Sequence, residues 1–478
     1  MKNKSIMQKY WVVAFLLAAT WGCKIAEPTS RVENKEVPGS YSTSLDTTNS
    51  AQIVWSEFFD DPYLKVLIDS ALAKNQELNI VMQEISIASN EVQARKGEYL
   101  PFVDIVGGAG LDKVGRYTRN GALEATTEIK PGEEFPEPYT DYMFGLSASW
   151  ELDVWKKLRN AKKAAVLRYL SSVEGKNFLV TQLVAEIANS YYELVALDNQ
   201  LAILNQNIEI QKNALEVVKL QKQAAKVTEL AVKRFEAEVA KNRSLIFDIH
   251  QNITVTENKI NYLVGRFPQP VERNHISFPD EIPNVIKYGI PSQLLGQRPD
   301  IRQAELELEA SKVDVKVAKA AFYPSFRITA GIGFQAFNPK YLVTTPESLL
   351  YSLAGDLVAP LINRNAIKAN YATANSKQVQ AIISYEQSIL NGYIEVANQL
   401  AKINNLEQSY ALKSEQVNAL TESITISNNL FRSARADYAE VLFTQREALE
   451  SKMELIETKM EQMKAMVQVY QALGGGWN

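Results

Sequence analysis

The sequence predicts an α+β membrane protein built as an internal repeat, in which each half of the chain supplies two β-strands and very long helices. Three observations predict this fold class. A helical pattern runs into a strand pattern at a proline in two places, these places align at a constant offset, and long segments with seven-residue spacing follow each of them. The 478 residues are 46% hydrophobic and 22% charged, which suits a large folded core and argues against disorder.

The first residues are typical of an export signal. Three lysines precede an apolar stretch at 11–19, and residues 20–23 read TWGC. We therefore expect residues 1–22 to be a signal peptide and Cys23 to accept a bacterial lipid anchor; the alternative is an ordinary cleaved signal followed by an incidental cysteine. Cys23 is the only cysteine, so an intrachain disulfide is excluded. No apolar run reaches the ~18 residues that a spanning helix needs.

Charge and motifs argue against nucleic-acid binding and catalysis. Without the three lysines of the signal, 51 − 3 = 48 basic residues face 55 acidic ones, so the exported chain is mildly acidic and gives no reason to expect nucleic acid as a partner. His250 and His275 have no cysteine partner or glutamate at metal-binding spacing, and no phosphate-binding glycine motif follows a strand. We expect no enzyme activity, no metal and no cofactor.

The repeat is clearest around two prolines. Residues 92–111 read VQARKGEYLPFVDIVGGAGL and residues 315–334 read VKVAKAAFYPSFRITAGIGF, and aligning Pro101 with Pro324 gives an offset of 324 − 101 = 223. Apolar residues alternate strictly after each proline, which predicts strands at about 102–112 and 325–335. Because proline lacks an N–H and fixes φ, it ends the preceding helix at what we expect to be the membrane surface.

A second alternating stretch follows in each half and predicts strands at about 141–151 and 348–359, related by an offset of 207 (353 − 146). The connection within the first half is longer by 16 residues, the difference of the two offsets (223 − 207). The extra residues lie in 115–141, which are polar, rich in Gly and Pro and without period, so we expect a surface loop there.

Long helices are predicted after the second strand of each half. Apolar residues recur every seven positions in two sets: Val180, Ile187, Leu194, Leu201, Ile208 and Leu215; and Ile389, Val396, Ile403, Tyr410, Val417, Ile424 and Phe431. Sustained heptads predict coiled helices, and a helix of ~70 residues spans on the order of 100 Å.

The strands point to a membrane. Each is ~10 residues long with one apolar face, as in a tilted membrane strand, but four strands cannot close a barrel and an open edge in lipid leaves backbone groups unpaired. The chain must therefore associate with copies of itself. Arg327, Thr329 and Asp104 on the opposite face are expected to line a watery lumen.

Four segments together carry a family resemblance. AKAAFYPSFRITAGIGF (318–334), QRPDIRQAELELEASKVDV (297–315), SWELDVWKKLRNAKKAA (149–165) and YQALGGGW (470–477) resemble the TolC-like outer-membrane efflux family, closest to its lipid-anchored OprM/NodT branch. The resemblance implies a homotrimer whose strands form a shared 12-stranded transmembrane β-barrel, continued by a long periplasmic α-helical coiled barrel. An equatorial belt would take Trp55–Lys74, the region 267–297 and the C-terminal tail. The implied domains are a lipid-anchored segment at 23–62 and two efflux repeats at 63–272 and 285–473.

The resemblance also implies a function. The protein would be the passive exit duct of a tripartite efflux system in the outer membrane, with a periplasmic adaptor and an inner-membrane pump of the resistance-nodulation-division type as partners. Two alternatives are a type I secretion exit duct and a periplasmic coiled-coil scaffold without a channel. Only the four alternating strands separate a channel from a scaffold, since a scaffold has no use for a face that lipid would cover. The transported substrate is not indicated.

The candidate sites lie in two helix turns, at 223–231 and 433–442. The resemblance places Glu229 and Glu440 at the acidic periplasmic gate, where a ring of carboxylates would attract cations; the alternative is that both are ordinary solvated charges. Ala224, Ala225, Ser433 and Ala434 are candidate adaptor contacts, or simply residues of tight turns. Alanines stand where the family usually has glycine, and Phe443 stands where some members have a second acid.

Arg298, before Pro299 and Asp300, is expected to mark a helix start, with Asp300 complementing the helix dipole.

Overall fold

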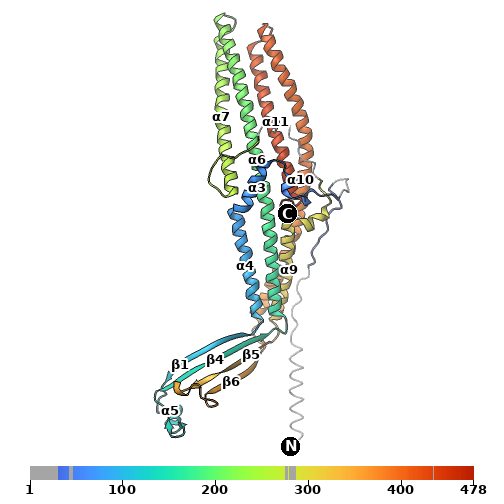
Figure 1. Ribbon diagram of the computed structural model, residues 1–478. Helices are drawn as coiled ribbons and strands as arrows, with labels where there is room; N and C mark the ends of the chain where they lie inside the picture. Colours follow the sequence, from blue (N-terminus) through green and yellow to red (C-terminus); the bar gives the residue numbers. More distant parts are fainter. Residues whose placement is uncertain (1–30, 42–46, 275–277, 279–286, 434, 478) are drawn as a thin grey trace.

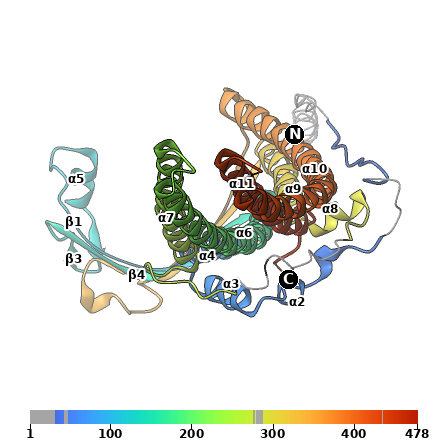
Figure 2. The same cartoon turned by 90° about the horizontal axis from the view of Figure 1, so that it is seen from above.

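The computed structural model describes residues 31–41, 47–274, 278, 287–433 and 435–477. The described chain is elongated, with a sheet at one end and helical hairpins at the other (Figure 1). Seen along its length, the two long hairpins lie side by side, and the sheet projects away from them (Figure 2).

The predicted repeat is present in the order of elements. The first half contains α4 (Gln76–Glu98), β1 (Phe102–Asp112), β4 (Tyr139–Leu152), α6 (Lys157–Gln223) and α7 (Glu229–Val264). The second half contains α9 (Pro299–Ala320), β5 (Ser325–Ala336), β6 (Leu349–Val358), α10 (Asn365–Arg432) and α11 (Tyr438–Ala472). Adding the offset of 223 to the first residue of α4 gives 299, the first residue of α9. The offset found at the two prolines therefore also relates the starts of these two helices.

The prolines separate helix from strand, as predicted. α4 ends at Glu98 and β1 begins at Phe102, directly after Pro101, while α9 ends at Ala320 and β5 begins at Ser325, directly after Pro324. The helix starts follow local rules as well. The Asn75 side chain accepts a hydrogen bond from the backbone N–H of Leu78 at 2.8 Å, and Pro299 occupies the first turn of α9.

The four main strands form one antiparallel sheet in the order β1-β4-β5-β6. Residues in register share a face, and one row across all four strands is apolar: Ile105, Leu146, Ile332 and Tyr351. The neighbouring row on the other face consists of small and polar residues: Asp104, Ser147, Gly331 and Ser352. The alternation predicted from sequence therefore gives the sheet one apolar and one polar face. Within the described chain, β1 and β6 each have one unpaired edge.

The predicted surface loop at 115–141 contains short regular elements that the sequence did not indicate. This segment contains α5 (Arg119–Glu124) and a small hairpin of β2 (Glu128–Lys130) and β3 (Glu133–Glu134). Thr118 caps α5 by accepting from the backbone N–H of Gly121 at 3.2 Å. Elements this short are set by caps and turns, so they leave no hydrophobic period in the sequence.

The two heptad rows differ in burial. In α6 the row from Val180 to Leu215 is almost entirely buried, because α6 lies between α4, α7, α9 and α11. Of the heptad row in α10, only Ile389 and Val396 are buried, and its other members are half-buried. Beyond Val396 the main neighbour of α10 is α11, so the outer part of α10 presents an apolar stripe that this chain covers only partly.

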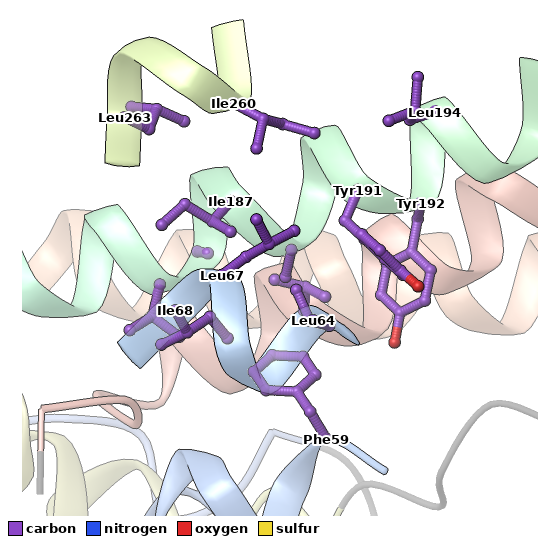
Figure 3. Close-up of a cluster of buried hydrophobic side chains, with 14 of the residues drawn as sticks. Phe59, Leu64, Leu67, Ile68, Ile187, Tyr191, Tyr192, Leu194, Ile260 and Leu263 are labelled. Carbon is purple, nitrogen blue, oxygen red and sulfur yellow. The ribbon is translucent and has the colours of Figure 1, made fainter. Parts of the chain in front are cut away.

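The largest core lies at mid-height, where α2 (Trp55–Phe58) and α3 (Pro62–Lys74) pack across the long helices. Figure 3 shows Phe59, Leu64, Leu67 and Ile68 gathered against Ile187 of α6, with Ile260 and Leu263 of α7 nearby. A second core lies between α9, α10 and α11, and Ala51 of η1 (Ser50–Gln52) and Leu294 of α8 (Leu294–Gln297) belong to it. Among the described helices, none is long and apolar enough to cross a membrane.

Candidate functional site at the hairpin tips

The first hairpin turns between α6 and α7, at the end of the molecule farthest from the sheet (Figure 1). Two backbone hydrogen bonds close the turn: Ala225 N–H donates to Lys222 O, and Lys226 N–H donates to Gln221 O, both at 2.9 Å. Ala225 has φ +57°, the left-handed conformation that usually falls to glycine after a helix. The turn thus keeps the geometry expected of a glycine although it carries alanine.

The second hairpin turns in a related way between α10 and α11. Arg435 N–H donates to Leu430 O at 2.9 Å. This bond joins residues five apart in the sequence, as the bond from Lys226 to Gln221 does in the first turn. The Asp437 side chain then caps α11 by accepting from the backbone N–H of Tyr438. Both predicted turns are therefore present, and both are short and exposed.

A hydrophobic cluster below the turns joins the two hairpins. Its buried members come from α6 and α7: Leu215, Val218, Ala231, Val232, Phe235 and Val239. Phe431, Tyr438 and Leu442 of the second hairpin pack against them. The two tips are thus held together by apolar packing.

Glu229 is engaged in ion pairs. Its carboxylate pairs with Lys222 across the turn and lies 3.9 Å from Lys233 Nζ on the next turn of α7. The hydrogen bond from Lys222 lowers the pKa of the Glu229 carboxyl, and the charge of Lys233 adds to this effect. Glu229 therefore fastens the end of α6 to the start of α7.

Glu440 lies in a different environment. It is exposed in the first turn of α11, and within the described residues no ion pair reaches its carboxylate. Phe443, one turn further on, is also exposed, and the guanidinium of Arg446 lies 5.0 Å from the centre of its ring. The two acidic residues that the sequence grouped together are thus not equivalent, because only Glu440 has its charge available to another molecule.

The small residues at the tips are accessible. Ala224 and Ala225 are exposed, and so is Ser433, whose hydroxyl donates to the carbonyl oxygens of Asn429 and Leu430 at 3.0 Å each. Ala434 lies outside the described residues, as do Cys23 and His275. His250 is exposed on α7.

Charged residues also line up on the polar face of the sheet. Arg327 lies between Glu151 of β4 and Asp356 of β6 in the strand register. Thr329 and Asp104 share this face. The polar face therefore carries both signs of charge at the end nearest the helices.

Arg298 has the structural role expected of it and two partners that the sequence did not reveal. Its guanidinium pairs with Asp300 at 2.7 Å, and it also bonds Glu395 of α10 at 2.7 Å and the backbone carbonyl of Ala472 at 2.8 Å. Burial would lower the pKa of this guanidinium, but the bonds to Asp300 and Glu395 outweigh it and raise the pKa above its usual range. Arg298 joins the start of α9, the middle of α10 and the end of α11.

These features define a class of protein: a channel subunit whose sheet offers one face to lipid and whose helical hairpins extend from the membrane. The chain matches the family described as outer membrane efflux protein over residues 67–266 and 290–475, and it belongs to that family. It is 25% identical to the probable outer membrane lipoprotein SilC of Salmonella typhimurium, over 97% of each chain. It is also 25% identical to the pyoverdine export outer membrane protein OpmQ of Pseudomonas aeruginosa, over 88% of this chain and 87% of that protein. The open state of the MtrE outer membrane channel of Neisseria gonorrhoeae has the same fold, with a TM-score of 0.82 and 22% identity over 95% of this chain and 99% of that one.

The chain is accordingly the outer-membrane channel of an efflux system. Within the described chain the sheet keeps one open edge at β1 and one at β6, which further copies of the chain would pair to close a barrel. Its relatives include a protein named as part of a cation efflux system, CusC of Escherichia coli, which is 25% identical over 96% of this chain.

Proposed function

We propose that Glu440 supplies one carboxylate per subunit to an acidic ring at the periplasmic end of the duct, whereas Glu229 is a structural residue of the turn. The observation that carries this proposal is the contrast in pairing: Lys222 and Lys233 neutralise Glu229, and Glu440 is exposed without an ion pair among the described residues. Three unpaired carboxylates around one axis attract cations, as acidic rings do in cation-selective pores. Transport through the duct is passive, and no catalytic step is part of this function.

Planar-bilayer recording tests the assignment. Glu440→Gln should reduce the preference for cations over anions, because it removes three negative charges from the narrowest part of the trimer. Glu229→Gln is the matched control, since it makes the same change of charge at the other tip and should leave the preference close to that of the wild type. Equal selectivity of Glu440→Gln and wild type would remove Glu440 from the gate.

We further propose that the exposed small residues at the tips are the adaptor contacts. Ala224, Ala225 and Ser433 offer surfaces without long side chains, which lets another helix approach closely; Ala434 completes the set from its position in the sequence. Cysteine introduced at Ser433 should form crosslinks to the adaptor in cells. Cysteine introduced at Leu412, an exposed position of α10 that lies 432 − 412 = 20 residues before the end of the helix at the tip, is the control and should not do so.

Cys23 is proposed as the lipid-anchored residue, and the distance it must cover supports this. Arg31 forms an ion pair with Glu386 of α10, which lies 386 − 365 = 21 residues from the start of that helix, or ~32 Å at 1.5 Å per residue. The 31 − 23 = 8 residues back to Cys23 reach ~26–29 Å when extended. Eight residues are therefore enough, at full extension, to cover most of the distance from Arg31 to the level where α10 begins. In the Cys23→Ser variant, the additional mass due to the attached lipid should be absent, and trimer formation should be unchanged.

The domain division proposed from sequence is an anchored segment at 23–62 and two repeats at 63–272 and 285–473. The two matched regions, 67–266 and 290–475, support it. The relatives include proteins named for cation efflux and for pyoverdine export at the same 25% identity, so family membership alone selects no substrate.

A further inference from the structure

Basic side chains gather on α6 directly beside the sheet. Half of the ten residues at 154–163 are basic, namely Lys156, Lys157, Arg159, Lys162 and Lys163, and no acidic residue occurs from 154 to 173. The whole chain has a formal charge of −4, so this concentration runs against its overall balance. We call Lys156, Arg159, Lys162 and Lys163 the basic collar.

The second half of the chain makes the same turn without these charges. Lys156 and Asn363 are both left-handed, with φ of +57° and +53°, and are separated by 363 − 156 = 207 residues, the offset that relates the second strands. The equivalent ten residues, 361–370, contain only Arg364 and Lys368 as basic residues. Since the turn forms in both halves, its geometry does not require the collar.

The collar is only partly neutralised within the chain. Lys157, outside the collar, pairs with Glu151 at 2.7 Å. Arg159 lies 3.6 Å from Asp153, whose two oxygens also accept from the backbone N–H groups of Leu158 and Arg159 at 2.9 Å each. Lys156 and Lys163 are exposed and form no ion pair with any described residue. The positive end of the α6 dipole adds to the uncompensated charge.

Aromatic side chains place the collar at the rim of the apolar sheet face. Trp150 belongs to that face, and its indole N–H donates to the carbonyl oxygen of Tyr99 at 3.0 Å. Lys162 Nζ lies 5.7 Å from the centre of the Tyr99 ring. Trp155 stacks on Tyr323 with 4.7 Å between ring centroids. Trp and Tyr are enriched where a membrane protein meets the headgroup layer.

The dimensions agree with a contact to headgroups. Lys163 is 163 − 157 = 6 residues into α6, or ~9 Å along the helix from its first residue. The polar layer of each leaflet is ~5–8 Å thick, and a lysine side chain can extend several ångströms toward it. The whole collar is therefore within reach of lipid phosphates.

We propose that the basic collar binds the phosphate groups of anionic phospholipids in the leaflet on the side of the long helices. The proposal rests on the placement of the sheet in the membrane and goes beyond it by naming the lipid class and the binding residues. Each basic residue beside an anionic surface contributes about fivefold to binding. Three of them acting together should produce a preference for anionic over neutral lipid of tenfold or more.

The test uses full-length protein and a variant that copies the second half of the chain: Lys156→Asn, Arg159→Ala and Lys163→Asn, matching Asn363, Ala366 and Asn370. The control variant Lys212→Asn, Lys219→Ala and Lys241→Asn makes an equal change of charge on the parts of α6 and α7 far from the sheet. Native mass spectrometry of the trimer would measure retention of phosphatidylglycerol and phosphatidylcholine. We expect wild type and control to prefer phosphatidylglycerol, and the collar variant to lose at least tenfold of that preference.

Two further arms separate the possible failures. Equal retention of the two lipids by the wild-type trimer, or an unchanged preference in the collar variant, would overturn the proposal. If inorganic phosphate binds tightly and displaces the lipid, the collar is a site for free phosphate and the proposal is overturned. Insertion of the wild type into vesicles of pure phosphatidylcholine tests the membrane placement by itself, so its failure is distinguishable from failure of the collar.

Discussion

The Nη1 atom of Arg298 lies 2.7 Å from a carboxylate oxygen of Glu395, and this ion pair joins the first turn of α9 to the middle of α10. The same nitrogen donates to the carbonyl oxygen of Ala472 at 2.8 Å, near the end of α11. One side chain therefore links three helices at the level where the short segments pack around the long ones. The side chain of Arg298 is 5% exposed, so water screens its interactions weakly.

Replacing Arg298 should destabilise the protein strongly. Arg298→Met would leave Asp300, which is mostly buried, without its partner, and we expect a loss on the order of 3 kcal/mol in the free energy of unfolding. Glu395→Gln is the comparison: this side chain is 54% exposed, so its removal should cost less than about 1 kcal/mol. Thermal unfolding of the purified trimer followed by circular dichroism measures both. Equal melting temperatures for Arg298→Met and wild type would contradict the role assigned to Arg298.

The left-handed alanine at the first tip gives a second prediction. Ala225 has φ +57°, a conformation that costs an L-residue about 1 kcal/mol and costs glycine almost nothing. Ala225→Gly should therefore stabilise the turn by about 0.5 kcal/mol after the greater entropy of glycine in the unfolded chain is subtracted.

The neighbouring alanine provides the control for this change. Ala224 has φ −84°, which any residue adopts, so Ala224→Gly should destabilise the same turn by about 0.5–1 kcal/mol. Native-state hydrogen exchange of the tip amides measures both variants. Faster exchange in Ala225→Gly than in wild type would show that the left-handed conformation is not a source of strain.

The features that the sequence predicted are those with a local pattern. Heptad spacing, strand alternation and the two prolines each act over a few residues, and the offset between halves confirms each pattern in a second copy. The features it missed depend on distant residues. Nothing near Arg298 indicates Glu395, which is 97 residues away. The pairing of Glu229 with Lys222 requires the turn to close first, so the sequence showed two similar tip acids where the structure shows different ones.

A buried glutamine between the helices gives a third prediction. Gln445 of α11 is 1% exposed, and neither its amide nitrogen nor its amide oxygen has a hydrogen-bond partner among the residues that the structure describes. An unsatisfied buried amide costs ~1–3 kcal/mol, so Gln445→Leu should raise the stability of the trimer by an amount of that order.

Gln211 is the control: it is equally buried and its amide nitrogen also lacks a partner among the described residues, but its amide oxygen accepts a hydrogen bond from the Asn242 amide at 2.7 Å. Gln211→Leu removes that acceptor and should destabilise the protein by ~1–2 kcal/mol. Thermal unfolding again measures the two variants, and the prediction is their opposite sign. A loss of stability in both variants would mean that the Gln445 amide forms hydrogen bonds in solution.

The ion pair of Glu229 predicts how the first tip responds to pH. The bond to Lys222 lowers the pKa of the Glu229 carboxyl below its ordinary 4.5. A carboxyl whose pKa is lower in the folded state stabilises that state fully above the unfolded pKa, and the stabilisation is lost as the pH falls through the folded pKa. Lys222→Gln should therefore accelerate hydrogen exchange at the tip at pH 7, relative to wild type, and the difference should diminish as the pH falls below 4.5 and the Glu229 carboxyl is protonated. Lys219→Gln, which interrupts only the pair of Lys219 with Glu216 within α6, controls for the lost charge and should not open the turn. A difference between Lys222→Gln and wild type that persists unchanged as the pH falls well below 4.5 would show that Lys222 acts on the tip by some means other than the Glu229 carboxylate.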